Sequence, residues 1–314
     1  MNATLFSTGE GYRDAPRTAS GPLEARYLAF LETITNLRPS LHRYCSRMTG
    51  SVLDGEDVLQ EALFLAYRKL DTFDDSRPLG PWLFRIAHNR CVDFLRRRGV
   101  REQAESEAAS TEADSTPPVE PVGPALGQAV EHFVLMLPPK ERACVLLKDV
   151  FDYSLEEIAE LVDSTVGGVK AALNRGRSKL AARSSVVAPL RVKTDEDAEL
   201  LRLYVDRFNQ RDWVGLRELI AADARLQVAD RFIGRFAESP YFRNYERLPP
   251  WRLTVGEVDG ETVVLIHHAA IDGWAPRAAV RLQMVDGRIV GITDYWHCPW
   301  VLQAATTVIA DQPS

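Results

Sequence analysis

Two clusters of basic side chains, far apart in the chain, have the composition expected of residues that bind a polyanion. The first lies between residues 85 and 101 and contains a single acid, Asp93, and the second lies between residues 170 and 183. Residues 102–127, between them, carry carboxylates and no lysine or arginine. Since the net charge of the chain is −6, this local concentration of positive charge favours two separate contacts with nucleic acid. The clusters are Arg85, Arg90, Arg96, Arg97, Arg98 and Arg101, followed by Lys170, Arg175, Arg177, Lys179 and Arg183.

The first cluster lies on a helix that the sequence predicts from about Pro81 to Arg98. Trp82 and Phe84 accompany the arginines, and this combination suits a splayed single strand, whose bases stack on rings while its phosphates meet guanidinium groups. A structural explanation stays open for arginines 96–98, because cations at a helix C-terminus complement the helix dipole. That explanation does not account for Arg85 and Arg90 or for the aromatic residues beside them, and Asn89 and Asp93 share the helix face of Arg85.

A preceding helix, predicted over VLQEALFLAYRKL with Asp54 and Asp57 as capping residues, has two distinct faces. Its apolar stripe predicts a buried side. The other side presents Asp57, Gln60, Glu61 and Phe64, spaced i, i+3, i+4 and i+7. This second face is either a solvated helix side or a docking surface for a basic partner helix.

The second basic cluster follows a predicted pair of short helices. Ser154 and Glu157 have the spacing of a capping box, and the residues from Asp163 to Thr165 predict a short turn before a second helix from Val166. Two helices joined in this way form a helix-turn-helix, whose second helix enters the major groove and is the one that needs positive charge. A plain helical hairpin is the alternative. The candidate DNA contacts on the second helix are Lys170, Asn174, Arg175 and Arg177.

The last third of the chain changes from helical patterning to alternating patterning. A helix pair runs into a strand, and Asp259-Gly260 and Asp286-Gly287 each separate two strand-like runs, which is a strong signal for hairpins. An α+β cone with a curved antiparallel sheet is therefore expected. Polar side chains there are candidates for acid–base chemistry or for structural roles at the mouth of the cone. They are His267, His268, Asp272, Asp294 and His297, and the two adjacent histidines must face opposite sides of their strand.

The 314 residues divide by composition into seven segments. No apolar run is long enough to predict a membrane span, no basic-then-apolar leader predicts secretion, and the four cysteines (Cys45, Cys91, Cys144 and Cys298) form no CxxC pair, so a reducing cytoplasm is expected. No metal site and no cofactor are expected. The segments are a disordered leader (1–22), a helical unit (23–101), an acidic linker (102–127), a helix-turn-helix unit (128–185), a short linker (186–195), an α+β domain (196–305) and a tail (306–314).

Two stretches of this sequence resemble a known family. DGEDVLQEALFLAYRKLDTF followed by PLGPWLFRIAHNRCVDFLRRR is similar to region 2 of the extracytoplasmic-function (group 4) RNA polymerase sigma factors. LPPKERACVLLKDVFDYSLEEIAELVDSTVGGVKAALNRGRSKL is similar to their region 4. The last third resembles SnoaL-like domains of the nuclear-transport-factor-like superfamily. The expected fold class is thus multidomain: a region 2 helical bundle and a region 4 helix-turn-helix, both all-α, and an α+β SnoaL-like cone.

The resemblance implies a transcription initiation factor that binds core RNA polymerase through its β′ clamp and β flap. It assigns polymerase docking to the polar face of the earlier helix, at Asp57, Gln60, Glu61 and Phe64. It assigns contact with the −10 promoter element to Trp82, Arg85, Asn89, Arg90 and Asp93. It assigns contact with the −35 element to Lys170, Asn174, Arg175 and Arg177. The acidic linker would lie in the polymerase cleft and RNA exit path. This sequence departs from many family members at Asp163, where they carry glycine, and at residues 167–172, where hydroxyls and an arginine are missing. Base-edge hydrogen bonds at the −35 element should therefore be fewer, and readout should depend more on phosphates and DNA shape.

The extra domain leaves three hypotheses open. In the first, the domain is an attached regulator that contacts regions 2 and 4, with its surplus of acidic residues against their basic DNA-facing patches. In the second, it is a SnoaL-like enzyme fused to a DNA-binding module. In the third, the whole chain is a transcription regulator that acts without binding polymerase. For the enzyme hypothesis the pocket candidates are His268, Asp272, Asp294 and His297. The acidic face around Gln60 and Glu61 argues against the third hypothesis, because a protein that binds only DNA has no use for it.

Overall fold

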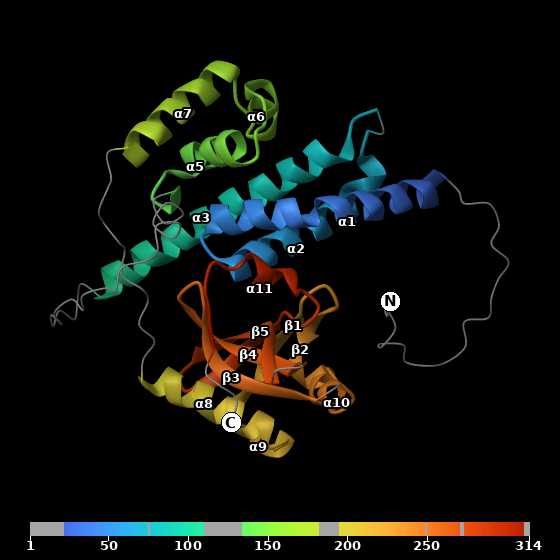
Figure 1. Ribbon diagram of the computed structural model, residues 1–314, viewed down its shortest axis with the longest axis vertical. Coiled ribbons are helices and arrows are strands. Elements are labelled where there is room, and N and C mark those ends of the chain that lie inside the picture. Colours follow the sequence, from blue (N-terminus) through green and yellow to red (C-terminus); the bar gives the residue numbers. More distant parts are fainter. Residues whose placement is uncertain are drawn as a thin grey trace.

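The computed structural model describes residues 22–74, 76–109, 134–181, 195–248, 250–270 and 273–310. Within these residues the chain forms a first helical unit, a second helical unit packed on one side of it, and a C-terminal α+β domain on another side (Figure 1). The expected leader, most of the acidic linker, the second linker and the last residues of the tail lie outside the described residues. None of the described helices is both long and apolar enough to cross a bilayer.

The first helical unit contains α1 (Pro22–Thr49), α2 (Val52–Lys69), the short η1 (Leu70–Thr72) and α3 (Leu79–Ala109). α1 ends at Gly50, whose φ of 88° favours glycine, and α2 begins immediately afterwards. The side chain of Ser51 caps α2 by accepting a hydrogen bond from the backbone N–H of Asp54 at 3.2 Å. The prediction that Asp54 and Asp57 cap this helix was wrong, because the helix starts earlier and both carboxylates lie within its first two turns.

α3 is longer than the helix expected from Pro81 to Arg98. It begins at Leu79 and continues through residues 102–109, which the composition assigned to the linker. These residues are mostly alanine, glutamate and glutamine, which are good helix formers, so the backbone has no reason to leave the helix at Arg101.

The second helical unit contains α5 (Pro139–Val145), the π-turn η2 (Leu146–Val150), α6 (Leu155–Leu161) and α7 (Val166–Ala181). The predicted capping box is present: Glu157 accepts from the backbone N–H of Ser154 at 2.7 Å, and the Ser154 hydroxyl accepts from the N–H of Glu157 at 3.2 Å. Asp163 adopts a φ of 48°, as a turn residue that replaces glycine must. α6 and α7 thus form the predicted helix-turn-helix.

A single hydrophobic core joins the two helical units. The fully buried Tyr44 of α1 packs its ring 5.9 Å from Phe84 of α3 and 5.9 Å from Phe151, which follows η2. Phe84 also lies 5.6 Å, between ring centroids, from Tyr153. The two units therefore bury apolar surface against each other and do not hang freely from a tether.

The C-terminal domain begins with α8 (Asp195–Asn209) and α9 (Trp213–Leu219), which lead into a curved seven-stranded sheet of order β2-β1-β6-β5-β4-β3-β7. β1 and β6 are parallel and all other neighbours are antiparallel. Both predicted hairpin turns exist, with Asp259-Gly260 and Asp286-Gly287 at positive φ. The strands are β1 (Ile220–Val228), β2 (Phe232–Arg235), β3 (Trp251–Val258), β4 (Glu261–Ala270), β5 (Gly273–Val285), β6 (Arg288–Asp294) and β7 (Val308–Ala310), with η3 (Phe236–Glu238) and α10 (Tyr241–Glu246) after β2 and α11 (Trp300–Ala304) before β7.

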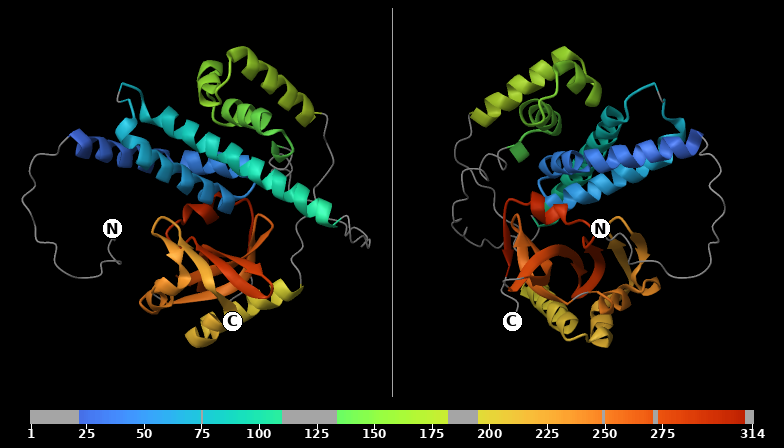
Figure 2. Two further views of the ribbon diagram at one scale, coloured as in Figure 1. Left: turned by 180° about the vertical axis from the view of Figure 1, so that it is seen from behind. Right: turned by 45° about the vertical axis from the view of Figure 1, so that its right-hand side comes forward.

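Aromatic side chains fill the interior of this domain. Phe208 of α8 lies at its centre, with ring centroids 5.0 Å from Tyr245 and 5.1 Å from Trp251. α8 and α9 cover one side of the sheet, and α11 and the sheet end near it approach the first helical unit (Figures 1 and 2). The observed architecture confirms the expected fold class of two all-α units and an α+β cone.

Candidate DNA and polymerase interfaces

The residues expected to meet the −10 element share the outer side of α3, but they differ in solvent exposure and in their contacts with neighbouring side chains. Arg85 and Asn89 are exposed. Arg90 is half-buried and lies 3.5 Å from the carboxylate of Asp93. Trp82 is half-buried against Phe73, with ring centroids 4.7 Å apart. This face therefore offers Arg85 and Asn89 directly to a ligand, while the other candidates are already in contact with neighbours.

A groove of about 380 Å³ separates this face from the second helical unit. Arg77, Trp82 and Arg85 line one wall, and Tyr153 lies opposite. Two carboxylates of α6, Glu157 and Glu160, complete that opposite wall. The acidic helix of the helix-turn-helix thus lies across the groove from the basic side chains that are expected to bind DNA.

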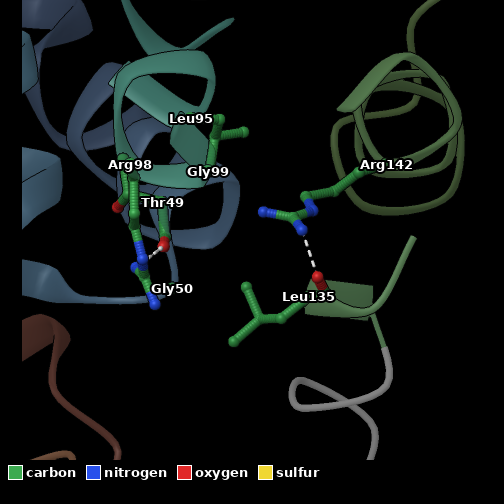
Figure 3. A pocket seen from close by; sticks show the side chains of 7 residues that line it. All are labelled: Thr49, Gly50, Leu95, Arg98, Gly99, Leu135 and Arg142. Carbon is green, nitrogen blue, oxygen red and sulfur yellow. Dashed lines mark hydrogen bonds between the residues drawn. The ribbon is translucent and has the colours of Figure 1, made fainter. Parts of the chain in front are cut away.

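A second pocket, of about 220 Å³, marks where the second helical unit is fastened to the end of α1 (Figure 3). The buried guanidinium group of Arg142 donates to the backbone carbonyls of Met48 and Leu135, and to that of Leu137 at 3.2 Å. Arg98 of α3 donates to the carbonyl of Thr49 at 3.3 Å across the same pocket. Burial lowers the pKa of Arg142 to about 10, so it stays protonated at neutral pH and holds the two units together through charge-assisted hydrogen bonds.

The residues expected to meet the −35 element also fall into two groups: some are bonded to carboxylates of the same helical unit, and others are exposed. Arg175 donates to Glu141 of α5 at 2.9 Å, and Lys179 donates to the same carboxylate at 2.8 Å. The hydrogen bond from Lys179 is the largest influence that holds the pKa of Glu141 below its ordinary value. Arg177 forms an ion pair with Asp149. Lys170 and Asn174 are exposed on α7.

The docking face predicted on α2 is split between the C-terminal domain and solvent. Asp57 accepts hydrogen bonds from Tyr295 Oη at 3.0 Å and from Arg281 at 3.2 Å. The Gln60 side-chain oxygen accepts from Gln227 at 3.2 Å. By contrast, Glu61 is exposed beside Arg97 of α3, at 3.6 Å, and Phe64 is 63% exposed.

Arg281 of β5 is the main cation of this interdomain contact. Its guanidinium group lies 2.9 Å from Asp54 as well as 3.2 Å from Asp57, and 2.7 Å from Glu261 in its own domain. Burial by itself lowers the pKa of Arg281, but Tyr295, Glu261 and Asp54 outweigh that effect and keep its pKa well above the ordinary value. One half-buried guanidinium thus lies among three carboxylates drawn from two domains.

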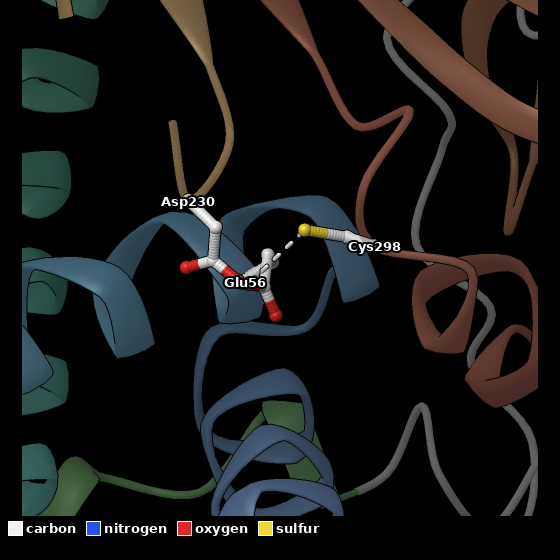
Figure 4. Close-up of side chains that lie close together, drawn as sticks. All are labelled: Glu56, Asp230 and Cys298. Carbon is white, nitrogen blue, oxygen red and sulfur yellow. Dashed lines mark hydrogen bonds between the residues drawn. The ribbon is translucent and has the colours of Figure 1, made fainter. Parts of the chain in front are cut away.

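A second set of interdomain contacts surrounds Glu56, which is completely buried (Figure 4). Glu56 accepts from Arg38 of α1 at 2.6 Å and from the indole N–H of Trp300 at 2.8 Å. Arg38 also lies 2.8 Å from Asp230, which follows β1. Potential metal-ligand atoms of Glu56, Asp230 and Cys298 lie within 4.8 Å of one another, but the Arg38 guanidinium already supplies the positive charge between the two carboxylates.

The charges in this contact oppose the expectation that acids of the C-terminal domain would meet basic DNA-facing patches. Around Arg281 the helical unit supplies the acids, Asp54 and Asp57, and the C-terminal domain supplies the cation. The pair of Arg38 with Asp230 has the opposite polarity, but Arg38 lies on α1 and not in either of the basic clusters expected to bind DNA. The expectation failed because the charge surplus of a whole domain does not determine the composition of a local patch. The hydrogen bonds and ion pairs described above between this domain and the rest of the chain run to α1, to α2 and to Ser51 between them. The expected contact with the second helical unit stays a prediction.

Burial in this contact changes the pKa of two carboxyl groups. It raises the pKa of Asp57 to about 7, against the opposing influence of Arg281 and of the hydrogen bond from Tyr295. It also raises the pKa of Asp230, against the influence of Arg38. His42, which lies 3.8 Å from Glu56 and bonds the carbonyl of Val52 at 3.0 Å, has its pKa lowered by burial.

Among the candidate acid–base residues of the C-terminal domain, Asp294 is enclosed by hydrogen-bond donors. Asp294 of β6 is 1% exposed and accepts from the hydroxyls of Tyr241 at 2.8 Å and Tyr245 at 2.5 Å, and from the backbone N–H of Trp296 at 2.8 Å. Burial raises its pKa despite these donors. The two pockets described above lie between the helical units, and neither is lined by these residues.

The histidines occupy different surroundings. His267 of β4 is buried, its Nε2 2.8 Å from the hydroxyl of Thr254, whereas the adjacent His268 is half-buried, consistent with opposite sides of the strand. His297 is half-buried after β6. Asp272 lies outside the described residues.

Comparison with known proteins gives matches to both helical units. The family model described as Sigma-70 region 2 matches residues 33–101, and that described as Sigma-70, region 4 matches residues 127–180. The chain is 34% identical over 162 residues to the ECF RNA polymerase sigma factor SigW of Bacillus subtilis (strain 168), an alignment that covers 48% of this chain and 87% of SigW. It is 32% identical over 168 residues to SigM of Mycobacterium tuberculosis (strain ATCC 25618 / H37Rv), covering 54% of this chain and 83% of SigM.

Solved structures that match parts of this chain include the extracytoplasmic function sigma factor SigJ of Mycobacterium tuberculosis. It is 17% identical, with a TM-score of 0.34, and the match covers 84% of this chain and 95% of SigJ. The sigma factor RpoE from Bartonella quintana, solved with the anti-sigma factor NepR, is 23% identical, with a TM-score of 0.40, and covers 49% of this chain and 95% of RpoE.

Proposed function

Because the chain belongs to the ECF RNA polymerase sigma factors, which recognise promoters for RNA polymerase, we propose that its C-terminal domain holds it in a closed, inactive form. The first helical unit is its region 2 and the second is its region 4. The observation that carries the proposal is that Asp57 and Gln60, on the face of α2 expected to dock on polymerase, are bonded instead to Arg281, Tyr295 and Gln227. Polymerase and the C-terminal domain would then compete for the same side chains.

The assignment of promoter contacts rests on the exposed polar side chains of two helices. Arg85 and Asn89 of α3 would meet the −10 element, with Trp82 as a stacking surface for a splayed base. Lys170 and Asn174 of α7 would meet the −35 element, since both are exposed. Arg175 and Arg177 would reach DNA only after leaving Glu141 and Asp149, and they are more suited to phosphates than to base edges.

The packing of region 2 against region 4 also supports a closed form. The nominal centres of the two promoter elements are separated by roughly 80 Å of duplex at about 3.4 Å per base pair. Phe84 of region 2 and Tyr153 of region 4 share one core in the described structure. The two units would have to separate before α3 and α7 engage both elements of one promoter.

Run-off transcription with purified core polymerase tests the proposal. Replacement of the central cation, Arg281→Ala, leaves Asp54, Asp57 and Glu261 without their shared partner, so it opens the chain. Transcription at limiting protein is expected to rise roughly tenfold, as it would for a closed form weakened by about 1.4 kcal/mol. Arg288→Ala, at the exposed start of β6, is the matched control and should behave as the parent. Equal transcription by the parent and Arg281→Ala would contradict inhibition, and absence of transcription from both would contradict the assignment as an initiation factor.

The enzyme hypothesis receives less support. Asp294 is enclosed by two tyrosine hydroxyls and a backbone N–H, inside a core packed with aromatic rings. A buried carboxyl of raised pKa is compatible with acid–base chemistry, but the three donors around Asp294 already occupy its oxygens, and it has 1% solvent exposure.

A further inference from the structure

We propose that core polymerase binds the closed protein first on an exposed apolar strip and then displaces the C-terminal domain from the adjoining half of α2. This inference rests on the proposed function. It concerns the order of events: the polymerase itself would open the chain, and prior release of the C-terminal domain would not be required.

The apolar strip consists of large side chains on α1 and α2 that face solvent. Tyr27 and Tyr67 join the two helices, with their rings in edge contact at 5.9 Å. Phe64 lies one turn before Tyr67 and has the guanidinium of Arg68 6.0 Å from its ring. The exposed fractions are 39% for Tyr27, 54% for Leu28, 39% for Leu31, 63% for Phe64 and 54% for Tyr67.

Such a strip needs an explanation. Single exposed apolar residues are common on soluble proteins, but a group of large apolar side chains on two packed helices is typical of a surface that binds a partner. Tyrosine and phenylalanine are also enriched where such partners bind. The C-terminal domain, which already covers the first turns of α2, leaves this group exposed.

The position of the strip on α2 identifies the partner. Phe64 lies one turn from Gln60, and Gln60 is the last α2 residue with a described bond to the C-terminal domain. The strip therefore continues the same helix face on which polymerase is proposed to dock. A partner that needs this whole face meets one half that is exposed and one half that is covered.

On the covered half of α2, basic side chains of the partner can replace Arg281 one contact at a time. Asp54 and Asp57 are held mainly by Arg281, and an incoming basic helix offers the same chemistry to both carboxylates. Glu61 is exposed and lies on α2 between Asp57 and Phe64, so it can bind the first basic side chain of the partner. A partner anchored on Phe64 and Tyr67 is thereby held next to the residues that it must capture, at high effective concentration.

The order of events has a kinetic signature. If the C-terminal domain had to leave first, the observed association rate would level off at the rate of spontaneous opening as polymerase concentration rises. If polymerase binds the strip first, the rate of initial capture keeps rising with polymerase concentration. Stopped-flow association of the full-length chain, labelled at a surface site remote from α1 and α2, with core polymerase distinguishes the two.

The variants are chosen to separate capture from the final complex. Phe64→Ala and Tyr67→Ala in the closed parent should slow association roughly tenfold. The same changes in an Arg281→Ala chain, which is already open, should slow it only about twofold, because the covered half is then available from the start. Val214→Ala, which truncates a 71% exposed apolar residue of the C-terminal domain, is the control and should change neither rate. Unchanged circular dichroism and melting temperature exclude unfolding as the cause.

Several results would overturn the inference. The strip would not be the first contact if the rate of initial capture by the parent reached a plateau as polymerase concentration rises. The same would follow if Phe64→Ala slowed association equally in the parent and in the Arg281→Ala chain. A concentration-dependent dimer of the parent, lost on Phe64→Ala in analytical ultracentrifugation, would mean that a second copy of this chain occupies the strip. If Arg281→Ala chains with an intact strip failed to bind polymerase at all, the proposed function would fail, which is a different outcome from failure of the binding order.

Discussion

Glu56 has no solvent exposure, and its surroundings show how a single carboxylate can serve two domains. It accepts from Arg38 and Gln60 in region 2 and from Trp300 in the C-terminal domain. A buried carboxylate costs free energy of folding unless donors satisfy its oxygens. Removal of either the carboxylate or one of its donors therefore leaves a buried polar group without its partner.

Glu56→Ala is therefore expected to lower the free energy of unfolding by about 3–5 kcal/mol, because it leaves the buried guanidinium of Arg38 with less compensation. Glu56→Gln keeps an acceptor oxygen and should lose less. Urea denaturation of both variants measures the difference. Glu246→Ala, at an exposed position at the end of α10, should change stability by less than about 0.5 kcal/mol. A similar small change for Glu56→Ala would show that the carboxylate is not needed.

Asp57 makes the closed form sensitive to pH. Its pKa is about 7 when the C-terminal domain covers it and should return toward the ordinary value near 3.8 when the domain leaves. A carboxyl whose pKa is higher in the closed form binds its proton more tightly there, so it stabilises closure at low pH, and this contribution disappears as pH rises through about 7. Asp230, whose pKa burial also raises, acts in the same direction.

Hydrogen exchange of the Tyr295–Trp300 segment, corrected for intrinsic rates, is expected to be slower at pH 6 than at pH 8. Asp57→Asn mimics the protonated carboxyl, so most of that difference should vanish in this variant. If Asp57→Asn keeps the full pH dependence, Asp57 is not its source.

At the scale of elements, the crossing of α1 and α2 beneath the interdomain contact depends on a glycine. A β carbon at Gly55 would lie 2.5 Å from the backbone nitrogen of Ser46 and 2.6 Å from its α carbon, so the helices could not keep their approach. Gly99 of α3, by contrast, has no atom within 4 Å of a built β carbon.

Gly55→Ala is expected to destabilise the protein by about 1–3 kcal/mol through overpacking, and to weaken closure because Asp54, Glu56 and Asp57 shift with the helix. Gly99→Ala should stabilise it by about 0.5–1 kcal/mol, because alanine is the better helix former. Thermal melting of the pair is an internal comparison, and equal effects would mean that the helix crossing adapts to the added methyl group.

The elements themselves were largely predictable from local patterns. The capping box at Ser154, the turn at Asp163 and the hairpins at Asp259-Gly260 and Asp286-Gly287 each depend on a few neighbouring residues, and the structure confirms them. The helix boundaries near Ser51 and Ala109 were less well predicted, since cap geometry and propensity compete there.

The interdomain contact was not predictable in the same way. Asp57 and Gln60 were singled out from their spacing, but nothing in the sequence pairs them with residues more than 160 positions away, such as Gln227 and Tyr295. Arg281 gave one possible signal, as a cation within the apolar run AAVRLQMV, yet a strand of this kind normally has a polar outer face. Contacts between domains depend on the surface shape of both, which local patterning does not contain.

At the scale of the whole molecule, regions 2 and 4 pack face to face, with acids of α6 across a groove from basic side chains of region 2.

Glu160→Gln removes one of these acids, so the free protein should bind a single-stranded −10 oligonucleotide about two- to fivefold more tightly at low salt, a gain of roughly 0.5–1 kcal/mol. Fluorescence anisotropy measures the affinity. Glu156→Gln changes an exposed acid of the same helix that does not line the groove, and it should have a smaller effect. Equal effects would mean that only the net charge matters.

Asp294 is the last residue of β6 and Tyr295 follows it, so that the first side chain lies in the aromatic interior and the second bonds Asp57 of region 2. The Asp294 carboxylate also fixes the backbone of Trp296, at the head of the segment that carries Cys298 and Trp300 to Glu56. Substitutions that repack the interior around Asp294 are therefore expected to alter the contact between Tyr295 and region 2 as well. A second-site suppressor of a change in region 2 could then arise inside the C-terminal domain, at a position that itself has no contact with region 2.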